Sequence, residues 1–165
     1  MAKIFLWSGR NPLAWSIKYF TDSKRSHCGF ILDTNEEIID SDWRWFPWSS
    51  GVLIRDFAQY KKYPDRLKII DLPFTDEQNK EIIDLATSYV GHAYYDLPLV
   101  ASFVWEWWSG DKAFNNMKHR ENAFTCSEFV AYCINKVTGH PIIEGRSIQS
   151  IRPHELGVLD EQRTT

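Results

Sequence analysis

Short apolar runs dominate the first half of the chain. They are rich in Ile, Val, Leu and Phe and are bounded by Gly, Pro, Asn, Asp or Ser, which is the pattern of β-strands. A turn at residues 33–35 would join two of the runs into an antiparallel hairpin, and a short helix is expected at residues 16–20. We predict five strands, at residues 4–7, 27–32, 37–41, 51–57 and 67–72.

The second half of the chain has helical spacing instead. Thr75 and Gln78 have the spacing of a capping box, and apolar residues then recur at intervals of three and four up to a stop near Gly91. Another helix, rich in aromatic rings, is expected at residues 97–108. Strands followed by helices predict an α+β fold with an antiparallel sheet.

A second capping box surrounds one of the three cysteines. Thr125 and Glu128 have the Thr-x-x-Glu spacing, which places Cys126 in the first turn of a helix that ends at Gly139. A thiol there lies at the positive end of the helix dipole, where the reactive thiolate is favoured. Taken alone, Cys126 is compatible with a structural thiol or with a nucleophile, whereas Cys133 lies deeper on the apolar face and is interpreted as structural.

Composition narrows the class of protein. The chain has 165 residues, 44% hydrophobic and 25% charged, without a linker-like tract, so we expect one globular domain over residues 1–165. A net charge of −3 disfavours nucleic-acid binding. Three cysteines make no disulfide framework, no signal peptide is recognisable, and no apolar stretch is long enough to span a membrane. We therefore expect a cytoplasmic protein, with release on lysis or another export route left open.

A thiolate nucleophile needs a base, and His27 is the best candidate. It opens an apolar strand, and Gly29 would leave space beside its ring on the same strand face. If Asp33 faces Glu36 across the turn, then His27 lies opposite Asp42 with Asp40 as the diagonal neighbour. Either carboxylate could orient the imidazole, although Asp40 fits better within the strand. The remaining histidines lie in expected loops: His92, His119, His140 and His154.

Competing uses of cysteine and histidine find little support. No C-x-x-C or H-x-x-x-H spacing is present, and His27 and Cys28 would point to opposite faces of a strand, so no metal and no cofactor are expected. Neither a glycine-rich phosphate loop nor a G-x-S-x-G motif occurs, which leaves nucleotide hydrolysis and serine-hydrolase chemistry without a basis.

Five short motifs, in this order, resemble a known family: SHCGFIL, EEIIDSD, VGHAYYD, FTCSEFVAYCI and RPHEL. The resemblance is to the circularly permuted branch of the NlpC-like, papain-fold cysteine hydrolases, which includes YiiX-like proteins and relatives of lecithin–retinol acyltransferase. It implies a circularly permuted papain-like fold in which Cys126 is the nucleophile, His27 the base and Asp40 the orienting acid. The family more often has Glu at the third place, and Asp where this chain has Glu155.

The family resemblance also implies a reaction class. Cys126 would attack a carbonyl carbon and form a covalent acyl-enzyme, and we expect an amide bond in a peptide, such as a peptidoglycan stem, as the target. Aromatic groups around Trp43 and Trp105 could wall the cleft, and Tyr95 could contact substrate or the oxyanion. The alternatives are a lipid or thioester acyl hydrolase or acyltransferase and an inactive binding protein on the same fold.

Overall fold

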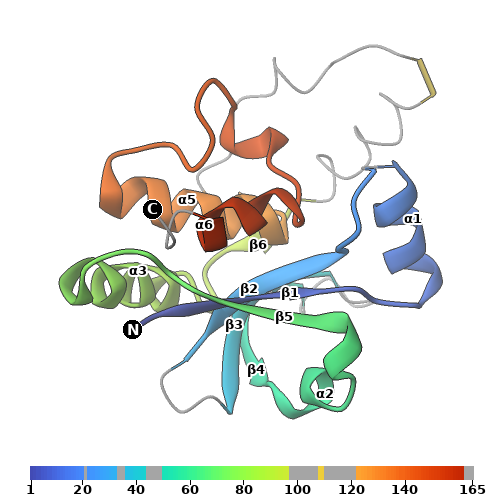
Figure 1. Ribbon diagram of the computed structural model, residues 1–165, viewed down its shortest axis with the longest axis horizontal. Coiled ribbons are helices and arrows are strands. Elements are labelled where there is room, and N and C mark those ends of the chain that lie inside the picture. Colours follow the sequence, from blue (N-terminus) through green and yellow to red (C-terminus); the bar gives the residue numbers. More distant parts are fainter. Residues whose placement is uncertain (21, 33–35, 44–49, 97–107, 110–121, 162–165) are drawn as a thin grey trace.

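A five-stranded antiparallel sheet forms the centre of the protein (Figure 1). The computed structural model describes residues 1–20, 22–32, 36–43, 50–96, 108–109 and 122–161. Neighbouring strands follow the order β4-β3-β2-β1-β5, so the first strand lies between the second and the fifth. The five strands are those predicted from the apolar runs: β1 (Lys3–Trp7), β2 (His27–Ile31), β3 (Glu37–Asp42), β4 (Gly51–Asp56) and β5 (Leu67–Asp71).

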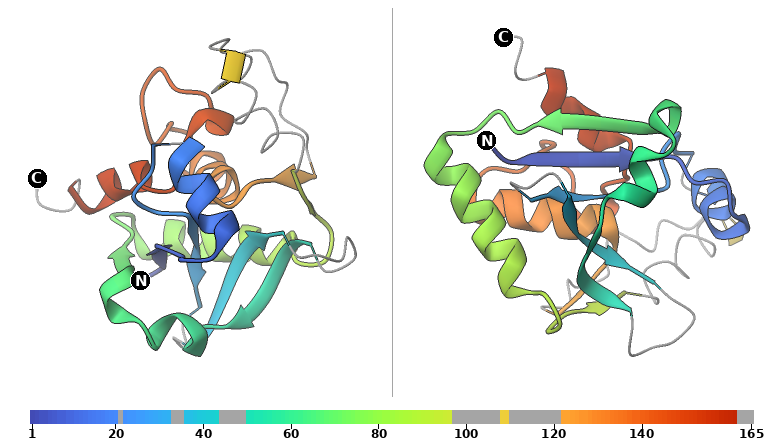
Figure 2. Two further views of the ribbon diagram at one scale, coloured as in Figure 1. Left: turned by 90° about the vertical axis from the view of Figure 1, so that its right-hand side faces the viewer. Right: turned by 90° about the horizontal axis from the view of Figure 1, so that it is seen from below.

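Helices complete an α+β fold. α3 (Asp76–Ser88) and α5 (Cys126–Thr138) pack against each other, and α5 also packs on β2 and β3. α1 (Pro12–Phe20) stands at the end of the sheet where β2 begins, as Figures 1 and 2 show. The shorter helical pieces are α2 (Ala58–Lys61), α6 (Val158–Glu161) and the 3-10 turns Pro64–Arg66, Ile148–Ser150 and Glu155–Gly157.

Both predicted capping boxes are present. The Thr75 hydroxyl accepts from the Gln78 amide at 3.2 Å, and the Thr125 hydroxyl accepts from the Glu128 amide at 3.4 Å. In each case the side chain of the third helical residue accepts from the amide of the capping threonine. These local bonds replace the carbonyl partners that the first turn of a helix lacks, which is why the starts of both helices were predictable.

Helix ends agree less well with the predictions. α1 begins at Pro12 and not at residue 16, because the Asn11 side chain accepts from the Ala14 amide at 2.6 Å and so caps an earlier turn. α3 ends at Ser88, and the chain continues through a turn before Gly91 takes a left-handed φ of 74°. The predicted turn at 33–35 and residues 97–107 of the predicted aromatic helix lie outside the described residues.

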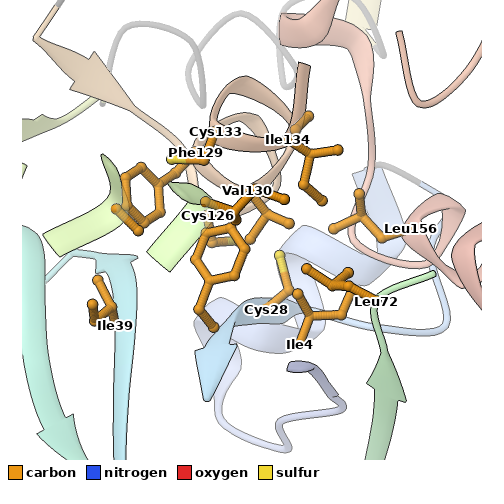
Figure 3. Packing of buried hydrophobic residues seen from close by; sticks show 14 of the residues in the cluster. Ile4, Cys28, Ile39, Leu72, Cys126, Phe129, Val130, Cys133, Ile134 and Leu156 are labelled. Carbon is orange, nitrogen blue, oxygen red and sulfur yellow. The ribbon is translucent and has the colours of Figure 1, made fainter. Parts of the chain in front are cut away.

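The sheet separates two apolar clusters. Alternate residues of β1 and β2, among them Ile4 and Cys28, face α3 and α5 and form the larger cluster (Figure 3). The opposite face carries a smaller cluster: Phe5, Ile31, Ile38, Phe57 and Tyr60. A residue of β2 therefore faces either the helix layer or the side of α2, and this alternation decides which groups meet at the site.

Two short strands connect the start of α5 to the sheet. β6 (Tyr94–Tyr95) and β7 (Ala123–Phe124) run parallel, with Tyr95 paired to Phe124. The buried Ser41 hydroxyl of β3 donates to the Phe124 carbonyl at 2.7 Å. These contacts fix the backbone immediately before Cys126 against β3. Neither β6 nor β7 was predicted.

Candidate active site

The pairing of β2 with β3 brings His27 and Asp40 together. Phe30 pairs with Ile39 and Ile31 with Ile38, which is the register predicted from a turn with Asp33 opposite Glu36. His27 Nε2 lies 2.6 Å from Asp40 Oδ2, and the Asp40 side chain is fully buried. Of the two carboxylates considered from the sequence, Asp40 is the one that contacts the imidazole, and Asp42 instead binds Arg55.

Gly29 permits this approach. A Cβ atom at Gly29 would lie 2.6 Å from the Ile39 carbonyl oxygen, 2.7 Å from Asp40 Cβ and 2.8 Å from the Phe5 ring. The space expected beside the His27 ring is therefore used by neighbours, since Phe5 and Asp40 occupy it. A side chain at this position would push β3 away from β2 and Asp40 away from His27.

Cys126 occupies the first turn of α5, where its side chain reaches the start of β2. The residue is 6% exposed, and Cys28 and the His27 ring are close enough to influence its ionisation. The bond from the Cys28 thiol, followed by the hydrogen bond and charge of His27, outweighs burial and lowers the pKa of Cys126 to about 5. Cys133, seven residues later in the same helix, shows the opposite behaviour, because burial raises its pKa.

The imidazole and the carboxylate stabilise each other's charge. Burial alone would lower the pKa of His27, but nearby negative charge and the hydrogen bonds to Asp40 and Cys126 raise it well above 6.5. Tyr60 and Asp40 are the two neighbours whose negative charge would raise the pKa of His27. Burial is the main cause that raises the pKa of Tyr60, so its phenol is neutral near pH 7. Near pH 7 the negative charge that attracts the imidazolium is therefore that of Asp40. Although burial opposes it, the pKa of Asp40 is lowered by His27 and Arg55. The structure thus favours an imidazolium between a carboxylate and a thiolate.

Arg55 is a site residue that sequence reasoning missed. Its Nε donates to Asp40 Oδ1 at 2.9 Å, its second terminal nitrogen binds Asp40 Oδ2, and its first binds Asp42 Oδ2 at 2.7 Å. The side chain is only 11% exposed, and it lies on the same sheet face as His27. The register of β4 on β3 places it there, with Arg55 paired to Ile38. Residues 44–49 offer no recognisable hairpin turn, so this register could not be assigned from the sequence.

A small cavity opens beside His27. Its volume is about 140 Å³, and four aromatic residues line it together with His27 and Asp42: Trp7, Trp43, Tyr60 and Tyr95. Tyr60 stacks on His27 with ring centroids 6.3 Å apart and also meets Trp7 edge-on at 5.1 Å. Of the three residues predicted to bind substrate, Trp43 and Tyr95 line this cavity, and Trp105 lies outside the described residues.

Tyr95 offers a neutral hydroxyl near the sulfur. Burial, and next the negative charge of Cys126, raises its pKa well above 10. The phenol therefore keeps its proton across the pH range in which Cys126 is ionised, and it can donate a hydrogen bond.

The described residues do not fit a metal centre. Among them, no group of three or more His, Cys, Asp or Glu side chains is arranged to hold a metal ion. His27 Nε2 is already bound to Asp40, which is itself bound to the Arg55 guanidinium, so this carboxylate has a cation as its partner.

The fold is similar to that of YiiX. The solved structure described as metalloprotein yiiX from Escherichia coli O157:H7, DUF1105, superimposes with a TM-score of 0.58 at 16% sequence identity, over 87% of this chain and 68% of that chain. No family model matches this chain, and no curated protein sequence matches it. At this identity the similarity concerns the fold, and it agrees with the α+β architecture and the five-stranded antiparallel sheet.

Across the residues that the structure describes, no helix is both long enough and apolar enough to span a bilayer.

Proposed function

We propose that this protein is a cysteine hydrolase with a circularly permuted papain-like fold that cleaves an amide bond. Cys126 is the nucleophile, His27 the proton-transfer group and Asp40 the residue that orients it. The proposal rests above all on the His27 ring, which is bound to Asp40 at 2.6 Å and whose hydrogen bond and charge help to lower the pKa of Cys126. A base held between an orienting acid and a nucleophile is the arrangement that nucleophilic catalysis requires.

The reaction begins from the ion pair between the Cys126 thiolate and the His27 imidazolium. The Cys126 thiolate attacks the carbonyl carbon, and the carbonyl oxygen becomes an oxyanion near the first-turn amides of α5 and the Tyr95 hydroxyl. Because Nε2 of His27 is held by Asp40, Nδ1 is the ring nitrogen that gives its proton to the leaving amine. The C–N bond breaks and an acyl-enzyme remains. His27 then takes a proton from water, which attacks the thioester and releases the acid.

The size of the cavity beside His27 matches a compact acyl or amine group of the substrate. Its volume of about 140 Å³ lies below the roughly 300–1,000 Å³ of most small-molecule pockets. Trp7, Trp43 and Tyr95 give it aromatic surfaces, and Asn11 and Ser26 add polar groups, which suits a planar group of side-chain size that also forms hydrogen bonds. We therefore place an amide in a peptide ahead of a long-chain lipid ester, which is the runner-up substrate because the same walls would also accept part of an acyl chain.

The first test is alkylation of each cysteine by iodoacetamide between pH 4 and pH 10, with the labelled residue located by peptide mass. We expect Cys126 to react with a midpoint near pH 5, well below Cys133. His27→Ala removes the imidazolium and should move the Cys126 midpoint to higher pH, whereas His140→Ala, an exposed histidine away from the site, should leave it unchanged. Slow labelling of Cys126 with an alkaline midpoint would contradict the proposal.

Turnover separates a hydrolase from a binding protein. Short peptide amides and acyl esters of increasing chain length are offered to the wild type and to Cys126→Ala. Cleavage of amides that is lost in the variant supports the proposed reaction, and cleavage of long-chain esters alone would favour the runner-up. A reactive Cys126 without turnover of either class would indicate a binding protein.

A further inference from the structure

A second cavity lies apart from the candidate active site. Its volume is about 480 Å³, within the usual range for ligand pockets, and none of the described residues lines both this cavity and the one beside His27. Four parts of the chain meet there: β1 at Leu6, the end of α1 with the loop that follows it, β5 at Lys68, and the C-terminal segment at His154 and Gly157. In Figures 1 and 2 the connection from α1 to β2 passes beside the red C-terminal segment.

The end of α1 and the loop that follows it contribute three cations. The Lys18 amine donates to the Gly9 carbonyl at 2.9 Å, and Arg25 donates to the Arg66 carbonyl at 2.8 Å. Both partners are neutral, so these bonds position the two side chains without cancelling their charge. Lys24 is exposed and forms no ion pair among the described residues.

The nearby acids do not balance these cations. Lys68, the fourth cation of the lining, binds Asp160 at 2.9 Å, so that pair is neutral. Among the described residues, Asp22 is the single acid that lines the cavity, and it offsets one of the three remaining positive charges. The wall therefore keeps a surplus of about two positive charges in a chain whose net charge is −3.

A hydrogen-bonding group of this wall also lacks a partner. His154 lines the cavity, and its Nδ1 atom is buried without a hydrogen bond within the described part of the chain. A buried polar atom of this kind costs free energy unless a ligand or an ordered water satisfies it. Because Nδ1 has almost no exposed surface, a ligand in the cavity does not reach it without a shift of the His154 ring, so the cations supply the contacts for an anion.

We infer that this cavity binds a small ligand through a phosphate group. A phosphate dianion matches the surplus charge, and its several oxygens can accept from Lys18, Lys24 and Arg25. A single phosphate does not fill about 480 Å³, so the rest of the space is for the organic part of the ligand. The inference is independent of the proposed hydrolase reaction, because it involves none of the residues assigned to that reaction.

The probe for the test is inorganic phosphate, followed by pyrophosphate, titrated into the full chain at constant ionic strength. Backbone amide chemical shifts in ¹H–¹⁵N spectra report both the affinity and the place of binding. We expect saturable shifts at Lys24, Arg25, Lys68 and Gly157, and tighter binding of pyrophosphate because of its greater charge. Absence of saturation at 20 mM, or saturable shifts confined to other residues, would overturn the inference.

Matched lysine variants test whether the cavity itself binds the anion. Lys24→Gln should weaken phosphate binding about threefold to fivefold, as expected for loss of one exposed charge contact. Lys24→Arg should retain the wild-type affinity. Lys62→Gln removes an equally exposed lysine outside the cavity and should have no effect. Equal weakening by Lys24→Gln and Lys62→Gln would show nonspecific attraction and would also overturn the inference.

Discussion

At the scale of single residues, the site depends on the guanidinium of Arg55, which was not among the predicted Cys, His and Asp residues. Arg55 binds both oxygens of Asp40 and one oxygen of Asp42, and its guanidinium lies 3.3 Å from His27 Nε2. It therefore holds Asp40 ionised and in place, and at the same time it disfavours a proton on His27. The two effects can be separated by substitution.

Arg55→Gln should move the pH dependence of the site in a defined direction. Loss of the guanidinium removes a positive charge beside His27, so the pKa of His27 should rise further and the imidazolium should persist to higher pH. Loss of a partner from a buried charge pair should also lower the free energy of unfolding by about 3 kcal/mol. Urea unfolding measures the stability, and the alkaline limb of Cys126 alkylation reports the His27 titration.

Two further variants show whether the Arg55 effect is specific. Arg55→Lys keeps the charge near His27 but cannot form the same set of bonds, so it should restore the pH profile more fully than the stability. Arg10→Gln, at a guanidinium that is 71% exposed, should change neither quantity. An unshifted alkaline limb in Arg55→Gln would contradict the assigned influence on His27.

Cys28 should control the acidity of its neighbour. Its thiol supplies the strongest of the hydrogen bonds that lower the pKa of Cys126, so Cys28→Ala should raise that pKa and move the alkylation midpoint to higher pH. Cys28→Ser keeps a donor and should restore much of the shift. Cys133→Ala also removes a buried thiol from the larger apolar cluster, yet it should leave the midpoint near pH 5. Equal midpoints in Cys28→Ala and the wild type would refute this assignment.

At the scale of elements, the spacing of β2 and β3 sets the distance between base and acid. Gly29→Ala would place a methyl group 2.6 Å from the Ile39 carbonyl oxygen, and the strands must then separate. Overpacking of this kind should cost about 1–3 kcal/mol of stability and reduce turnover as Asp40 withdraws from His27. Thermal unfolding and kcat/KM measure the two effects. Gly157→Ala is the control, since an added Cβ there meets nothing within 4 Å.

The elements also show why sequence reasoning succeeded where it did. The capping boxes around Thr75 and Thr125 and the β2–β3 register depend on residues close together in the chain, so their patterns were readable. The place of Arg55 and the β6–β7 pair depend on tertiary contacts across long separations, which leave no periodic signal. The His27–Asp40 contact could thus be predicted, whereas the ion pairs that hold Asp40 could not.

At the scale of the whole molecule, the two halves of the chain supply different parts of one site. The sheet carries His27, Asp40 and Arg55, and α5 brings Cys126 from the second half of the chain. Packing in the larger cluster, where Phe30 meets Phe129 with ring centroids 5.9 Å apart, holds these halves together. Global stability and the geometry of the site are therefore linked. Because Asp40 is a buried charge within the site, we expect the stability of the whole protein to depend on pH.

Asp40 should govern part of the acid unfolding of the protein. Its pKa in the folded state is lower than the usual 3.8, because His27 and Arg55 outweigh the effect of burial, so its ionised form stabilises the fold above about pH 4. This contribution is lost as the pH falls through the lowered pKa. Asp40→Asn mimics the protonated acid, and it should be less stable than the wild type by about 3 kcal/mol at pH 6 because it leaves Arg55 without its charged partner.

The difference in unfolding free energy between the wild type and Asp40→Asn should therefore shrink as the pH is lowered from 6 toward 2. Urea unfolding followed by tryptophan fluorescence at several pH values measures it. As a control, Asp84→Asn removes the charge of an exposed carboxylate paired with Lys80. Its unfolding free energy should equal that of the wild type at every pH. A constant difference across this range would mean that Asp40 keeps the same protonation state in the folded and unfolded chains, and the ionised carboxylate would then lose its role in holding the imidazolium beside Cys126.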